Sequence, residues 1–132
     1  MRKILALLFV LLSFFAATHV ALAKDINIES LSDGAKVDAE ITVSGTVHNA
    51  NEVWVIVHPR ETTDYWVQSS VIVKDDRWDV RISIGRTSAI DSGKQFEIMA
   101  VADPQQPLAE AQVFKEWPAA RWKSQVVSIT RK

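Results

Sequence analysis

The sequence predicts an all-β fold, an antiparallel β-sandwich of about seven to eight strands with one short helix before the last strand. Apolar and polar residues alternate over most segments after residue 24, as they do in strands with one buried face. Turn residues recur at intervals of about ten residues, which is typical of a sandwich. The chain contains no Cys, so we expect its core to form without disulfides.

Two strands and a turn are predicted first. Residues 25–29 alternate polar and apolar side chains, as in a half-buried strand. Residues 32–34 form a turn in which the glycine can adopt a positive φ. Residues 40–48 alternate again, so we expect one face of this strand to join the core.

The next segment predicts a central strand. We expect residues 49–51 to close a hairpin that leads into residues 53–57. Because residues 53–57 are apolar on both faces, one face is expected on the core and the other under a loop, a helix or a partner. Pro59 ends this strand because proline cannot donate to a ladder.

The middle of the chain shows short strands and then the clearest alternation. Residues 65–68 and 71–73 are predicted strands, separated by a bend or bulge at two serines. Residues 75–76 make the next turn. Residues 78–84 then alternate strictly, which places Trp78 in the core.

The C-terminal third contains a strand, the predicted helix and a last strand. Residues 96–102 alternate with their apolar members inward. Residues 108–117 are the predicted helix, because Pro107 fits a first helical turn and Pro118 ends one. Residues 125–130 form the predicted last strand.

Residues 1–23 have the pattern of a secretory signal peptide. Two basic residues precede an apolar stretch at residues 4–17, and Ala21 and Ala23 are small residues at positions −3 and −1 of an expected cut before Lys24. The alternative is a retained membrane anchor. The apolar stretch has about 14 residues, whereas a membrane span needs about 20, so cleavage is the favoured interpretation.

Cleavage would leave residues 24–132 as a single domain in the periplasm or outside the cell. No cysteine is available to carry a lipid at the new N-terminus. The formal net charge of the whole chain is −1, and losing the two basic residues of the leader leaves about −3. Nucleic acid is therefore not an expected partner, because phosphate binding needs a concentrated basic face.

The segments on both sides of the predicted central strand resemble a known class of domain. The opening residues are similar to those of bacterial extracytoplasmic immunoglobulin-like domains, and the later segments resemble one recurrent subgroup of these domains. In that subgroup a Trp-containing strand ends in a basic-Pro turn, and a Tyr-aromatic-Gln strand, a Trp strand and an acidic-Gly turn follow. The matching residues are 32–37, 41–47, 53–59, 64–68, 76–78 and 91–101. The resemblance covers nearly the whole chain after the leader and implies an accessory or binding module.

The chain contains five tryptophans, a high number for a domain of this size. Exposed coplanar aromatic rings on a β-sandwich can stack on sugars, whereas buried rings form core. Trp78 belongs to the inward row of its strand. Trp117 and Trp122 bracket Pro118, and we expect them to cover the outer face of a sheet.

The candidate binding residues are His58, Arg60, Tyr65 and Trp66. Because Tyr65 and Trp66 are consecutive in a strand, they point to opposite faces, and one of them is expected to be partly exposed. Together with His58 and Arg60, the exposed ring would form an aromatic, basic patch of the kind enriched at binding hot spots. The alternative is a packed hairpin over which the arginine stem lies.

Catalytic and metal-binding patterns are weak. A nucleophilic triad needs a positioned histidine, and the chain after the leader has only His48 and His58, which are predicted as surface residues at strand ends. These two histidines lack a third metal ligand at motif spacing. Asp75, Asp76 and Asp79 lack the spacing of a calcium loop and indicate a solvated turn. Chance pairs among sixteen acids do not indicate a glycosidase, so no catalytic residue, metal or cofactor is assigned.

The sequence therefore predicts a non-enzymatic exported binding module that recognises an envelope protein or another extracytoplasmic partner. An edge strand of a sandwich can accept another strand, so strand addition is one expected mode of recognition. The alternative is a carbohydrate-binding module that uses an exposed Trp or Tyr ring, with Trp66 and Tyr65 as the candidates.

Overall fold

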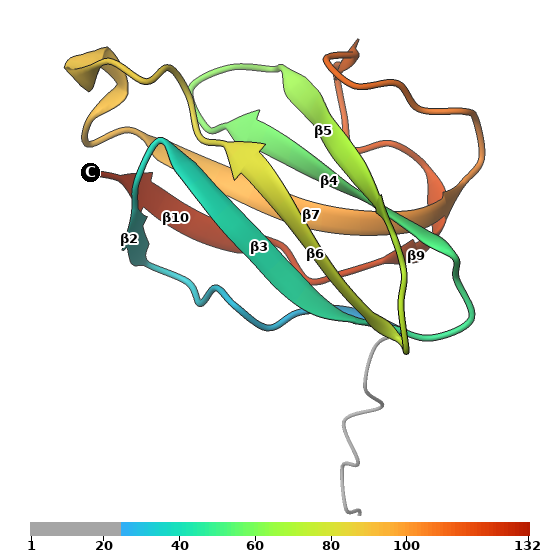
Figure 1. The fold of residues 1–132 in the computed structure, drawn as a ribbon. Coiled ribbons are helices and arrows are strands. Elements are labelled where there is room, and N and C mark those ends of the chain that lie inside the picture. Colours follow the sequence, from blue (N-terminus) through green and yellow to red (C-terminus); the bar gives the residue numbers. More distant parts are fainter. Residues whose placement is uncertain (1–24) are drawn as a thin grey trace, which may run out of the picture.

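The computed structural model describes residues 25–132, which form a sandwich of two β-sheets (Figure 1). The small sheet has the strand order β1 (Ile26–Ile28), β3 (Glu40–Val47), β6 (Arg77–Ser83). The large sheet has the order β2 (Ala35–Val37), β10 (Val127–Arg131), β7 (Gln95–Pro104), β4 (Glu52–Pro59), β5 (Tyr65–Ile72), β8 (Val113–Phe114), and β9 (Ala120–Lys123) also pairs with β7. The predicted all-β sandwich is confirmed, although the described residues form ten strands and include one parallel pair, β2 with β10.

The main core lies between the two sheets. Trp78 and the alternate residues after it on β6 are buried there, together with the inward faces of β4 and β7. Trp78 is 3% exposed, and its indole Nε1–H donates to the carbonyl of Thr46 at 3.0 Å. Gly45 on β3 lets β1 approach, because a Cβ at this position would lie 1.8 Å from the carbonyl oxygen of Asn27. The core position predicted for Trp78 is confirmed.

A second apolar cluster covers the outer face of the large sheet. Ile56 of β4 and Val101 of β7 are buried there under side chains of residues 105–119, including Trp117. The predicted central strand is confirmed, since β4 lies between β5 and β7 and a loop covers its outer face. Trp117 belongs to this cover as predicted. Trp122 instead packs against the main core, so the two tryptophans do not form one lid.

The helix predicted over residues 108–117 is wrong. These residues belong to the loop over the large sheet and include the edge strand β8. The Val67 N–H donates to the Gln112 carbonyl at 2.9 Å, so the loop meets its backbone hydrogen bonds by pairing with β5. A helix confined between the two prolines would have about ten residues, which is marginal on its own. The one helical turn within the described residues is the 3-10 turn η1 (Ala89–Asp91).

Two predicted turns connect the two sheets. The hairpin predicted at residues 49–51 is wrong, because this segment carries the chain from β3 in the small sheet to β4 in the large one. The turn at Asp75 and Asp76 is confirmed, and its φ values of 53° and 60° suit a tight two-residue turn. It leads from β5 in the large sheet to β6 in the small sheet, and an isolated bridge between Lys74 and Arg77 closes the turn.

Two strand boundaries also differ from the sequence prediction. The two short strands around the serine pair form one strand, β5, with a register shift opposite the stretch from Trp54 to Ile56, so the expected irregularity is a bulge. The last strand, β10, is preceded by β9 on the same edge of β7. Residues 124–126 separate them, and the Ser124 hydroxyl accepts the Ala100 N–H at 2.8 Å. A side chain therefore takes the place of a ladder bond at this break.

The predicted signal peptide, residues 1–23, lies outside the described residues. Within residues 25–132, no helix is long and apolar enough to cross a membrane.

Candidate functional site: a groove at the open edge of the sandwich

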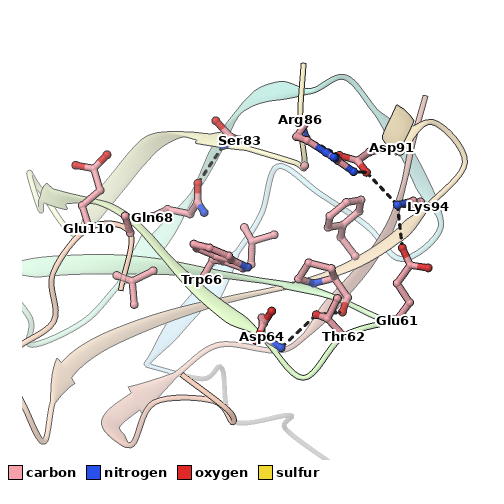
Figure 2. A pocket seen from close by; sticks show the side chains of 16 residues that line it. Glu61, Thr62, Asp64, Trp66, Gln68, Ser83, Arg86, Asp91, Lys94 and Glu110 are labelled. Carbon is pink, nitrogen blue, oxygen red and sulfur yellow. Dashed lines mark hydrogen bonds and ion pairs between the residues drawn. The ribbon is translucent and has the colours of Figure 1, made fainter. Parts of the chain in front are cut away.

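A groove lies between the two sheets at the edge formed by β5 and β6. The turn between the two strands is closed by an isolated bridge between Lys74 and Arg77, and the strands diverge from this turn (Figure 1). The start of β5 and the end of β6 border a pocket of about 610 Å³ (Figure 2). Its lining combines apolar side chains, among them Val57, Trp66 and Phe96, with several charged ones. The volume falls in the usual range of ligand pockets.

One wall of the groove is a charge network centred on the buried Asp91. The Nε and Nη2 atoms of Arg86 each lie 3.2 Å from a carboxylate oxygen of Asp91, and the Arg86 backbone N–H donates to the same carboxylate at 2.7 Å. The Lys94 ammonium lies 3.1 Å from Asp91 and 3.1 Å from Glu61. The hydrogen bonds from the Arg86 side chain and backbone hold the pKa of Asp91 well below its usual range, and Asp91 raises the pKa of both Arg86 and Lys94. The wall is therefore fully charged at neutral pH.

The same wall is anchored from behind by Arg131 of β10. This arginine is 5% exposed. Its guanidinium donates to the carbonyls of Ile84 at 2.8 Å and Ser88 at 3.0 Å, and also to the carbonyl of Arg86. A guanidinium has five donors in a fixed plane, so one side chain can hold three carbonyls of one loop. The last strand of the chain thus sets the position of the groove wall.

The opposite side of the groove presents an exposed indole. Trp66 is 41% exposed and pairs within the large sheet with Val57, whose side chain faces the main core. Gln68 lies two residues further along β5 and reaches across the groove, where its Oε1 accepts the Ser83 N–H at 3.0 Å (Figure 2). At this end of the groove the Gln68 side chain links the two sheets, and no backbone ladder joins β5 to β6.

Carboxylates outnumber cations in the lining of the groove. The acidic members are Glu61, Asp64, Asp91 and Glu110, and the basic members are Arg86 and Lys94. Both basic side chains contact Asp91, and Asp64 pairs with Lys115 at 2.6 Å. Glu110 has no ion pair among the described residues, and it lines the groove together with Gln68. The groove therefore carries one carboxylate without a cationic partner.

The structure separates the candidate binding residues. His58 is 6% exposed, so its prediction as a surface residue is wrong. Its ring stacks on Tyr65 with centroids 3.9 Å apart and planes inclined by 3°, and its Nδ1 lies 3.0 Å from the Asp64 carbonyl. Trp117 meets Tyr65 edge to face at 4.7 Å. His58 and Tyr65 thus pack on the outer face of the large sheet, where the loop over residues 105–119 covers them.

Arg60 and Trp66 lie apart from that stack. The Arg60 guanidinium donates to Gln95 Oε1 at 2.8 Å on the exposed turn after β4. Trp66 points into the groove, on the face of β5 opposite Tyr65, so the opposite orientation of these two rings is confirmed. Of the four candidates, Trp66 alone lines the groove, and the structure does not bring them together as one patch.

Other groove residues were not identified from the sequence. Gln68 was noted only as part of a Tyr-aromatic-Gln strand, and Asp91 only as part of a turn before the next strand. Arg86 and Glu110 also lie outside the motifs of the sequence analysis. Arg131 could not be identified from its neighbours, because the carbonyls that it holds belong to residues more than 40 positions away in the sequence.

The lining of the groove can be described by the kinds of groups that it contains and by those that lie elsewhere. Within residues 25–132, no group of three or more His, Asp or Glu residues is placed to hold a metal ion. His48 lies 3.7 Å from Asp76, His58 contacts Asp64, and neither histidine lines the groove. The groove presents an aromatic face, charged side chains and the end of an edge strand, all of which are groups that recognise a ligand.

Comparisons of this chain with protein-family models, with curated proteins and with solved structures found no match.

Proposed function

We propose that this protein is an exported, non-enzymatic binding module that recognises another extracytoplasmic protein through the groove between β5 and β6. The observation that carries the proposal is the 41% exposed indole of Trp66, set in a groove beside the end of an edge strand. A tryptophan at such a position is a typical hot spot of protein recognition.

The export part of the proposal rests on the leader. Residues 1–23 have the charge, length and cleavage pattern of a secretory signal. We place the protein in the periplasm or outside the cell, where its partner would also be found.

A protein partner is favoured over a carbohydrate by the arrangement of the rings. Stacking on a sugar chain is strongest with several exposed rings in register. Tyr65 is stacked on His58, and Trp117 packs against Tyr65, so neither ring is presented as a free face. Among the large apolar side chains that are exposed in the described residues, Trp66 is the one aromatic ring.

The test is capture of extracytoplasmic proteins by three immobilised forms of the protein, purified after export with its own leader. The forms are the wild type, Trp66→Ala and Ile72→Ala. Ile72 is a matched control, because it is 70% exposed on the same strand but does not line the groove. Bound proteins are identified by mass spectrometry, and the same three forms are applied to a glycan array.

We expect at least one protein to be retained by the wild type and by Ile72→Ala but lost with Trp66→Ala. Capture that does not depend on Trp66 would refute the groove as the binding site. Glycan binding that Trp66→Ala abolishes, without Trp66-dependent protein capture, would replace the proposal with carbohydrate recognition.

A further inference from the structure

We propose that the groove accepts an extended segment of the partner as an added strand beside the end of β6, with a lysine or arginine side chain of that segment over Trp66. This inference rests on the proposed function, because it states how the partner occupies the same groove. Strand addition supplies affinity through main-chain hydrogen bonds, and side-chain pockets supply specificity.

The end of β6 has a free edge that faces the groove. β6 is the last strand of the small sheet and pairs along one side with β3. In an antiparallel ladder, successive residues point their backbone groups to alternate sides. The Ile84 N–H donates to the Ala39 carbonyl at 2.7 Å, continuing the ladder toward β3, so Ser83 points its backbone N–H the other way. The acceptor there is Gln68 Oε1, so a single side chain occupies the position of a neighbouring strand.

The groove provides an apolar surface beneath that position. Val57 and Phe96 line it from the large sheet, and Trp66 adds an indole that is 41% exposed. β5 and β6 converge at the bridge between Lys74 and Arg77, so a segment has room at the open end but not along the whole of β6. An added strand there would bury the indole and replace the glutamine as the partner of Ser83.

The charges of the groove select a basic segment. Arg86 and Lys94 are both held by Asp91, which leaves Glu110 as a carboxylate without a cation. The Ala111 N–H donates to the Val67 carbonyl at 2.9 Å, which fixes Glu110 beside the stretch of β5 that carries Trp66. A lysine or arginine over the indole gains a cation–π contact and a nearby opposite charge, whereas an acidic residue would be repelled.

The test joins a probe strand to the C-terminus, so that the result does not depend on the identity of the partner. Arg131 contacts the groove wall, and its carbonyl accepts the Gly93 N–H at 2.7 Å, so a segment joined after Lys132 starts beside the groove. A Gly/Ser linker of about ten residues spans roughly 18 Å. The probe strand follows the linker and has seven residues, in which valine and threonine alternate around a central lysine. The high effective concentration of a tethered segment makes weak binding measurable.

Two control strands are matched to the probe. In the first, two threonines are replaced by proline, which cannot pair in a ladder. In the second, glutamate replaces the central lysine. All three fusions are made in the wild type and in Gln68→Ala, because the variant removes the internal acceptor of the Ser83 N–H and leaves that amide free to report an added strand. Amide hydrogen exchange at Ser83 and thermal unfolding are measured.

With the lysine strand, we expect Ser83 exchange in Gln68→Ala to slow by about tenfold or more, and the melting temperature to rise by about 4 °C or more. The glutamate strand should stabilise less at low salt, and about 0.5 M salt should remove this difference. The proline strand should leave both measurements unchanged.

Equal rates of amide exchange at Ser83 with the lysine and proline strands would overturn the claim that the segment adds to β6 as a strand. Slowed exchange at Ser70 and Ile72 in place of Ser83 would also overturn it, because the strand would then pair with β5. Equal stabilisation by the lysine and glutamate strands would overturn the claim that the groove prefers a basic segment. Trp66-dependent protein capture together with any of these results would leave the proposed function standing and remove only this mode of binding.

Discussion

Trp78 and Trp66 lie on neighbouring strands and face the space between the two sheets, yet their environments differ. Trp78 on β6 is 3% exposed at the closed part of the sandwich, where it pairs with Gly45 of β3 and packs in the main core. Trp66 on β5 is 41% exposed at the open part, where β6 has no further strand beside it. The same residue type therefore stabilises the fold at one end and remains accessible to solvent at the other.

Replacing each tryptophan with alanine gives the largest expected contrast. Trp78→Ala should lower the free energy of unfolding by about 3–5 kcal/mol, because it removes a buried aromatic side chain and leaves a cavity. Trp66→Ala should cost less than about 2 kcal/mol, since much of the ring already contacts water. Urea unfolding measures both. A loss under about 1 kcal/mol for Trp78→Ala would show that the comparison is wrong.

Arg131 tests whether the groove wall belongs to the rigid part of the molecule. Arg131→Met leaves three carbonyls of the wall without their donor and should cost about 2–3 kcal/mol, with faster amide exchange in residues 84–91. The control is Arg81→Met, which breaks an exposed ion pair with Glu40 and should change the stability by less than about 0.5 kcal/mol. Similar effects of the two substitutions would indicate that water replaces Arg131 as the donor.

Acid should loosen the groove wall. The hydrogen bonds from Arg86 lower the pKa of Asp91 in the folded protein, so the stability that they supply is present above the unfolded-state pKa of about 4. It is lost as the pH falls below that value and through the lowered folded-state pKa. The free energy of unfolding should therefore fall more steeply between pH 5 and pH 2 in the wild type than in Asp91→Asn or Arg86→Met. Parallel curves for the three proteins would contradict this account.

Gln68→Ala is expected to have the smallest effect, below about 1 kcal/mol. It removes one hydrogen bond to Ser83 in a position that water can reach. Hydrogen exchange should accelerate at Ser83 while the buried Trp78 region keeps its protection. A loss above about 2 kcal/mol would mean that the glutamine is a structural link and that the opening is not available for a strand.

Much of the fold could be predicted from local patterns. Alternation placed Trp78 inward and identified the strands that became β3, β6 and β7, because side-chain direction in a strand depends only on the parity of the residue. The turn at Asp75 and Asp76 could also be predicted, because a tight turn depends on two adjacent residues.

The errors all involve partners far away in the sequence. Residues 108–117 lie between two prolines and suggested a helix, but pairing with β5 gives their backbone better partners. His58 was expected at the surface because it ends a strand, and the loop over residues 105–119 buries it. The segment 49–51 suggested a hairpin because nothing local shows that the next strand joins the other sheet.

By itself, the sequence determined the strand content, the tight turns, the inward faces and the leader pattern, because each of these depends on residues that are close together in the chain. Only the tertiary structure decided which strands share a sheet, that β6 ends the small sheet, and that Trp66 faces an opening closed by one glutamine. The physical reason is that an edge or a groove is defined by what is absent beside a strand, and only the pairing of distant strands shows that absence.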